Sequence, residues 1–120
     1  MTTAIIVLTA VFFLGMGLCA LAVPAAIGKP FRIVVEAPES RSEIRAVYGG
    51  FGLAMAAVLI TALFLDGLRT GVVVTVAAAL AGMALGRVIS RLVDAPTRFY
   101  PVWFYFGVEA VAAALLFAVA

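Results

Sequence analysis

The sequence predicts an all-α integral membrane protein: an antiparallel four-transmembrane-helix bundle that forms one domain over residues 1–120. Hydrophobic residues make up 67% of the chain, charged residues only 12%, and the mean hydropathy is +1.28. A soluble domain is about 45–50% apolar and about 25% charged. Four apolar runs also approach the roughly 20 residues that a helix needs to cross a bilayer. This composition excludes a soluble enzyme, a nucleic-acid-binding module and a disordered tail.

The first apolar run contains no charge and predicts a helix over about residues 3–28. The connection that follows this helix contains prolines, which disfavour a continuous helix. Residues 31–35 of the connection are β-prone and are expected to lie extended at the membrane interface. The second helix is predicted over about 41–65. Ser40 is its expected N-cap, and Glu43 stands at the third helical position of a capping box.

A third helix is predicted over about 70–93, after the turn signal Asp66-Gly67. A fourth is predicted over about 98–120, where Pro101 is tolerated in the first turn. Aromatic residues crowd the start of this last helix, which is typical of the belt at a membrane–water interface. Because lipid offers no hydrogen bonds to the backbone, four spans with short connections favour antiparallel helices.

The basic residues are distributed unequally between the two predicted membrane sides. The side with both termini holds only Arg69, whereas the side with connections one and three holds Lys29, Arg32, Arg41, Arg45, Arg87, Arg91 and Arg98. We expect a multi-pass protein of the plasma (inner) membrane, and the positive-inside rule predicts its orientation. Both termini are expected outside, and connections one and three in the cytoplasm.

One carboxylate is expected near the middle of the bilayer. Glu109 lies roughly 12 Å along the fourth helix from Pro101, on a rise of about 1.5 Å per residue. A charge at this depth is costly and normally faces the bundle interior with a partner. Arg87 and Arg45 start from the same side of the membrane, and a guanidinium can bind a carboxylate through two parallel bonds. We therefore expect one polar pocket, lined by Arg45, Tyr48, Arg87, Arg91, Tyr105 and Glu109.

Three roles are open for this pocket. The arginines and Glu109 can form a structural ion-pair network that locks three helices together. The pocket can instead bind an anionic or amphipathic ligand, such as a lipid headgroup or a quinone. In the third reading Glu109 titrates during proton coupling.

Small residues indicate where helices approach one another closely. Gly49, Gly50 and Gly52 lie in the first part of the second helix. On the third helix, Ala78, Gly82 and Gly86 recur every four residues and form a small-residue stripe. We expect packing within the chain at both places, and a homodimer interface is the alternative for the stripe. The residues expected in helix packing are Gly49, Gly50, Gly52, Ala78, Gly82 and Gly86.

The stretch Glu43-x-Arg45-x-x-Tyr48-Gly49-Gly50, followed by Gly86-Arg87 and by Glu109 in the last helix, resembles a bacterial four-helix membrane family, domain of unknown function 4345. The resemblance covers essentially the whole chain. It implies a four-span architecture in which Glu43, Arg45, Tyr48, Arg87 and Glu109 belong to one shared design. It implies no activity.

The residue inventory predicts that the protein is not an enzyme. The chain has no histidine and a single cysteine, and it contains no nucleophile triad, phosphate loop or metal-ligand cluster. We expect no catalytic residue, no metal and no cofactor. The favoured function is a non-catalytic membrane subunit or a lipid- or amphipath-binding module, and the alternative is a proton-linked small-molecule carrier acting as an oligomer. The expected partners are the lipid bilayer and a larger membrane complex or a second copy, without nucleic acid.

Overall fold

The computed structural model describes residues 1–120 and is helical throughout, without strands. Four helical stretches are long and apolar enough to cross a membrane. This confirms an all-helical chain with four candidate spans, as the apolar runs predicted. The spans are Thr2–Ala22, Pro38–Phe64, Asp66–Val93 and Phe99–Val119.

The first helix is shorter than predicted. α1 (Thr2–Ala22) ends where Val23 leaves helical geometry, and a short α2 (Pro24–Gly28) follows in a new direction. Pro24 has no N–H to continue the hydrogen-bond ladder of α1, so the break falls just before it. A 3₁₀ turn, η1 (Lys29–Phe31), completes this segment, and an irregular stretch leads to the next helix.

The second span is built from three pieces. These are α3 (Pro38–Ile44), the π-helical turn η2 (Arg45–Gly50) and α4 (Phe51–Phe64). The predicted capping box is wrong. The helix begins at Pro38, a favoured first helical residue, so Ser40 lies inside its first turn and no side chain caps the N-cap Ala37.

The third and fourth spans are α5 (Asp66–Val93), η3 (Phe99–Trp103) and α6 (Phe104–Val119). A sharp turn at Leu65 separates α4 from α5. Arg69 supports this turn by donating hydrogen bonds to the carbonyls of Ala62 and Leu63 at 3.2 and 3.0 Å. These bonds satisfy carbonyl groups that the end of α4 leaves without partners.

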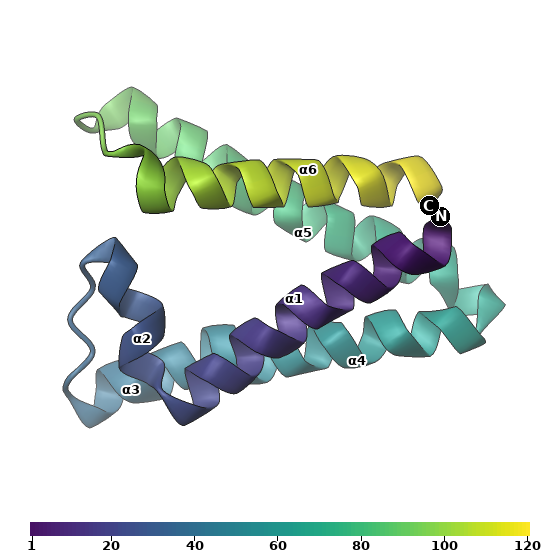
Figure 1. The fold of residues 1–120 in the computed structure, drawn as a ribbon, viewed down its shortest axis with the longest axis horizontal. Helices are drawn as coiled ribbons and strands as arrows, with labels where there is room; N and C mark the ends of the chain where they lie inside the picture. The colour runs from purple at the N-terminus through teal and green to yellow at the C-terminus, as the bar shows by residue number, and fades with distance from the viewer.

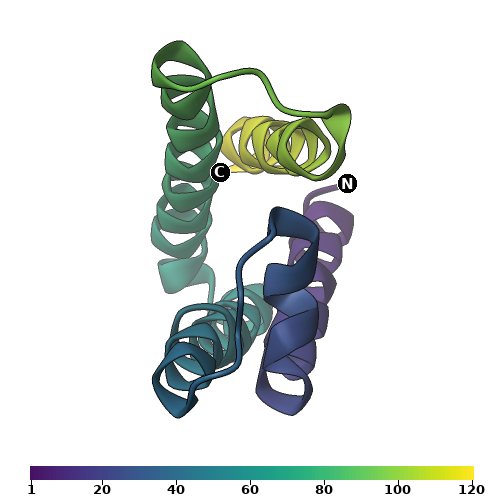
Figure 2. The same cartoon turned by 90° about the vertical axis from the view of Figure 1, so that its left-hand side faces the viewer.

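The helices associate as two pairs, α1 with α4 and α5 with α6 (Figure 1). The pairs meet at the end where both termini lie and diverge toward the opposite end, which carries α2, α3 and the α5–α6 connection (Figures 1 and 2). The main apolar core lies at the closed end. It contains Ile6 and Phe13 of α1, Leu59 of α4, Val73 of α5 and Leu116 of α6 among its buried residues.

Glycines allow α1 and α4 to approach closely. A Cβ atom on Gly52 would lie 2.8 Å from the Phe13 carbonyl oxygen, and one on Gly17 would lie 2.9 Å from the Gly49 carbonyl oxygen. Gly49 is itself buried, and a Cβ there would lie 2.8 Å from the Leu21 side chain. Gly52 and Gly49 therefore lie in the expected packing region, and Gly17 joins them.

The small-residue stripe of α5 does not pack inside the chain, so this prediction is wrong. Ala78, Gly82 and Gly86 are exposed, and a Cβ on either glycine would meet no atom within 4 Å. Gly50 is also exposed. The buried face of α5 is instead made by larger apolar residues such as Val76 and Leu80.

Candidate functional site

An ion pair joins the two C-terminal spans at mid-depth. Arg87 of α5 donates two parallel hydrogen bonds to Glu109 of α6, Nε to Oε1 at 2.7 Å and Nη2 to Oε2 at 2.9 Å. Glu109 is the eleventh residue of the 21-residue span Phe99–Val119 and is only 2% exposed. The spacing along the helices predicted this pairing, and the structure brings the two side chains together.

A cavity of about 350 Å³ opens beside this ion pair, between the two diverging helix pairs. All four spans and the α2–η1 segment contribute to its wall. Most of the lining is apolar, and the polar side chains are limited to two tyrosines and the ion pair. The lining residues are Phe12, Met16, Ala26, Ile27, Pro30, Phe31, Ile33, Tyr48, Met83, Arg87, Tyr105 and Glu109.

Aromatic rings surround the Arg87 guanidinium. Its central carbon lies 5.4 Å from the centre of the Phe31 ring and 6.0 Å from that of Tyr105. The two rings are 5.5 Å apart. A guanidinium at these distances is attracted to the ring faces, so Phe31 links the first connection to α5 and α6 across the opening.

Sequence reasoning missed this position of Phe31, which was expected to begin an extended interfacial stretch and instead ends a 3₁₀ turn. The only signal is its place beside Pro30, whose fixed φ angle supports the 3₁₀ turn. Hydrophobic periodicity does not report on a single residue in an irregular segment. Its contact with α6 depends on how α2 folds back from the end of α1.

Arg45 and Arg91 do not belong to the cavity. Arg45 Nε donates to the Leu21 carbonyl oxygen at 3.1 Å, where the helix break leaves the last turn of α1 with free acceptors. Arg91 is exposed near the end of α5 and makes no ion pair with Asp94. The predicted pocket therefore retains Tyr48, Tyr105 and the Arg87–Glu109 pair, and loses two of its three arginines.

The polar side chains of the cavity include hydrogen-bond donors that a ligand could use. Both carboxylate oxygens of Glu109 accept bonds from Arg87, whereas Arg87 Nη1 and the hydroxyl of Tyr48 make no hydrogen bond within the chain. The opposite charges of the pair also cancel. Such a site suits an apolar molecule that carries an oxygen acceptor, such as an ester or a ketone.

A family model, Domain of unknown function (DUF4345), matches residues 1–120, and the chain belongs to this family. No curated protein and no solved structure matches the chain. The family description assigns no activity. Any functional conclusion therefore depends on the geometry of the site.

Proposed function

We propose that this protein is a non-catalytic module that binds a lipid or a similar amphipathic molecule in the cavity between its two helix pairs. The observation that carries the proposal is an apolar cavity of about 350 Å³ whose wall includes a fully paired, mid-span Arg87–Glu109 bridge. Apolar pockets with a few convergent polar groups are the usual form of a small-molecule site.

The proposal places the chain in the plasma membrane as four antiparallel spans, with both termini outside and the first and third connections in the cytoplasm. The excess of basic residues near those connections supports this orientation. The diverging end of the helix pairs then faces the cytoplasmic leaflet. In this proposal, a lipid from that leaflet enters the cavity at the diverging end.

The bidentate bond favours this function over a proton-linked carrier. Both oxygens of Glu109 accept a hydrogen bond from Arg87, so a proton-coupled cycle would have to break this ion pair in every turn. Removing the bond would also leave a buried charge without a partner, which is costly. We assign the pair a structural role in the wall of the site.

Photocrosslinking tests the proposal. Phospholipids with a diazirine at the end of an acyl chain, both zwitterionic and anionic, are reconstituted with the protein, and the labelled residues are mapped by mass spectrometry. We expect labels on the cavity residues Phe12, Met16 and Met83. Labels confined to outward-facing residues such as Leu18 and Ile89 would overturn the proposal.

Two tryptophan variants of α2 make this experiment specific. Ala26 lines the cavity, so Ala26→Trp is expected to occupy part of it and to reduce cavity labelling. Ala25 is the neighbouring exposed residue and does not line the cavity. Ala25→Trp should therefore label like the unmodified protein, and equal labelling in both variants would contradict binding in the cavity.

A further inference from the structure

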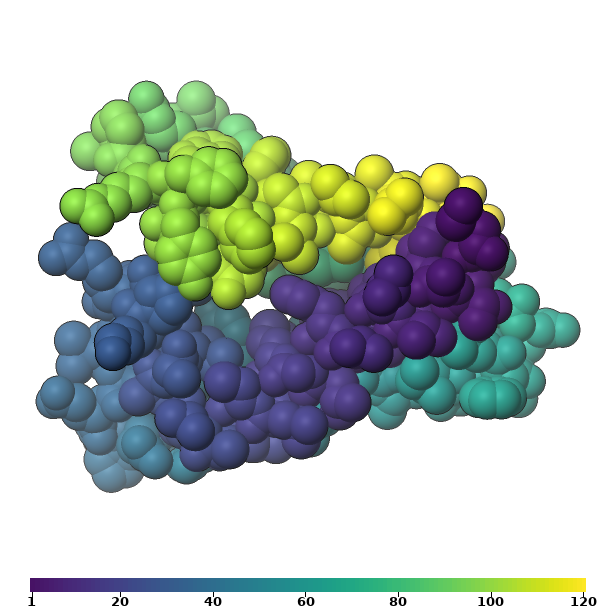
Figure 3. All heavy atoms as spheres, in the orientation of Figure 1, coloured from purple at the N-terminus to yellow at the C-terminus, as the bar shows by residue number.

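A second hollow lies outside the first, at the diverging end of the molecule. Its volume is about 670 Å³, and it separates the η1 segment from the connection between α5 and η3. In the space-filling view, a notch at this edge parts the blue first connection from the green start of η3 and α6 (Figure 3). The lining residues are Pro30, Phe31, Arg32, Pro96, Thr97, Arg98, Tyr100, Pro101 and Val102.

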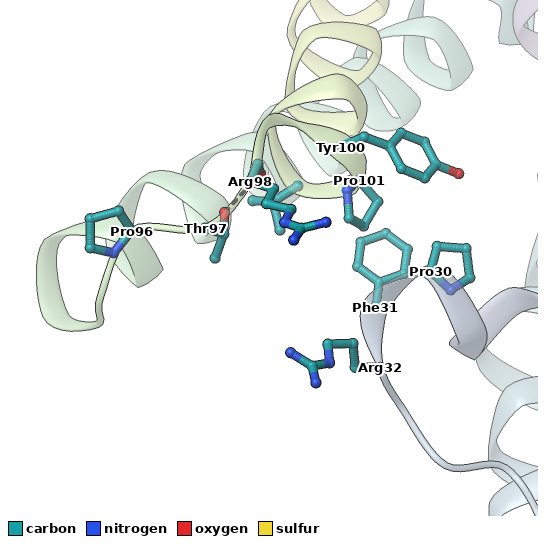
Figure 4. A pocket seen from close by; sticks show the side chains of 9 residues that line it. Pro30, Phe31, Arg32, Pro96, Thr97, Arg98, Tyr100 and Pro101 are labelled. Carbon is teal, nitrogen blue, oxygen red and sulfur yellow. Dashed lines mark hydrogen bonds between the residues drawn. The ribbon is translucent and has the colours of Figure 1, made fainter.

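Two arginines from different connections face this hollow. Arg32 follows η1 and Arg98 precedes η3, and their guanidinium groups extend into the space between the two segments (Figure 4). Neither forms an ion pair with a carboxylate. Two like charges directed at one hollow repel each other, and an anion between them would remove this repulsion.

The backbone of Arg32 gives an independent reason to assign it a role. Its φ and ψ angles are 62° and 26°, and it is the only non-glycine residue with a positive φ. It occupies the position after a helix end where glycine is usual, because other L-residues are disfavoured in the left-handed region. An arginine at a position suited to glycine indicates a function of its side chain, since such strain concentrates at functional sites.

The two cavities share a wall. Pro30 and Phe31 line both of them, so the Phe31 ring stands between the arginine hollow and the apolar cavity beside Arg87. The arrangement matches an amphipathic molecule with a charged head outside and a chain inside. Guanidinium groups are well suited to phosphate because they donate parallel hydrogen bonds.

We propose that Arg32 and Arg98 bind a phosphate group, and that this phosphate belongs to the headgroup of an anionic lipid whose chain enters the cavity behind Phe31. This inference rests on the proposed function, because it identifies the chemical class of the ligand for the same opening.

Native mass spectrometry of the protein in a neutral detergent tests the assignment. The protein is titrated separately with phosphatidylglycerol, phosphatidylcholine and inorganic phosphate. One basic residue at an anionic surface typically strengthens binding about fivefold, so two predict a preference of about 25-fold for phosphatidylglycerol over phosphatidylcholine. Arg32→Gln and Arg98→Gln should each reduce this preference about fivefold.

Two further variants separate binding from folding. Arg32→Gly removes the charge and relieves the left-handed strain, so it should reduce the preference about fivefold, as Arg32→Gln does, while its thermal stability does not fall. Arg91→Gln removes an equal charge from an exposed residue outside both hollows. This control should keep the full preference.

Equal affinities for the two lipids, or an equal loss of preference in Arg91→Gln, would overturn the anion site. Displacement of phosphatidylglycerol by millimolar inorganic phosphate would support the phosphate site but overturn the assignment to a lipid. Acyl-chain labelling inside the cavity without any headgroup preference would refute this inference and leave the proposed function standing.

Discussion

The Arg87–Glu109 pair allows the sharpest quantitative prediction. Arg87→Met and Glu109→Leu each leave one charged group without its partner. Removing one member of a buried ion pair costs about 3–5 kcal/mol. The Glu109 side chain is 3% exposed, but that of Arg87 is 21% exposed toward the cavity, so we expect the lower end, about 3 kcal/mol per variant.

The double variant Arg87→Met/Glu109→Leu should be far less damaging than either single change. It removes both charges at once and leaves apolar side chains of similar size, a replacement that is often neutral for buried pairs. The free energy of unfolding is measured by circular dichroism in mixed micelles with increasing sodium dodecyl sulfate. Arg91→Met is the matched control, because Arg91 is exposed and has no ion-pair partner.

Two results would refute this reasoning. The first is a loss below about 0.5 kcal/mol in both single variants, which is the level of an ordinary surface substitution. The second is a double variant whose loss equals the sum of the single losses. Additivity would mean that the two side chains do not interact, although they lie in direct contact.

Three further substitutions test the packing of the helices. Gly52→Ala should destabilise the protein by about 1–3 kcal/mol in the same assay, because the new Cβ would lie 2.8 Å from the Phe13 carbonyl oxygen. Full stability of this variant would mean that α1 and α4 are farther apart. Gly82→Ala should be neutral or stabilising by up to about 1 kcal/mol, since the new Cβ meets nothing within 4 Å. A clear loss of stability would show that another molecule covers this face of α5. Arg69→Ala should cost about 1–3 kcal/mol because it frees two carbonyls at the end of α4, and an unchanged free energy of unfolding would argue against this support of the turn.

The four spans and the buried ion pair could be predicted from the sequence for simple physical reasons. Apolar length defines a span because the bilayer thickness is fixed. The helical rise then places Arg87 and Glu109 at similar depths, and a charge at that depth requires a partner. Tyr48 and Tyr105 followed from the same reasoning, and both line the cavity.

The errors on the glycine stripe and on Arg45 have separate physical origins. In a membrane helix the outward and inward faces are both apolar, so hydrophobic periodicity does not distinguish them. The stripe containing Gly82 and Gly86 could therefore be recognised as one face, but not assigned to the inside or the outside. Arg45 was placed at the correct end of the molecule, yet the free Leu21 carbonyl that it binds depends on the break at Val23.

The position of Phe31 could not be predicted for a different reason. Its neighbours Tyr105 and Arg87 are more than 50 residues away in the sequence, and the contact depends on the path of an irregular connection. The same holds for Arg32 and Arg98, which come from connections one and three. Phe31 lines both hollows, whereas Arg32 and Arg98 line only the outer one.

The most direct measurement is an experimental density map of the protein in a bilayer of native lipids. We expect elongated density that enters between Arg32 and Arg98, passes the Phe31 ring and ends between Phe12 and Glu109. If the two helix pairs instead close on each other, so that these side chains fill the cavity, the protein has no lipid site at this position.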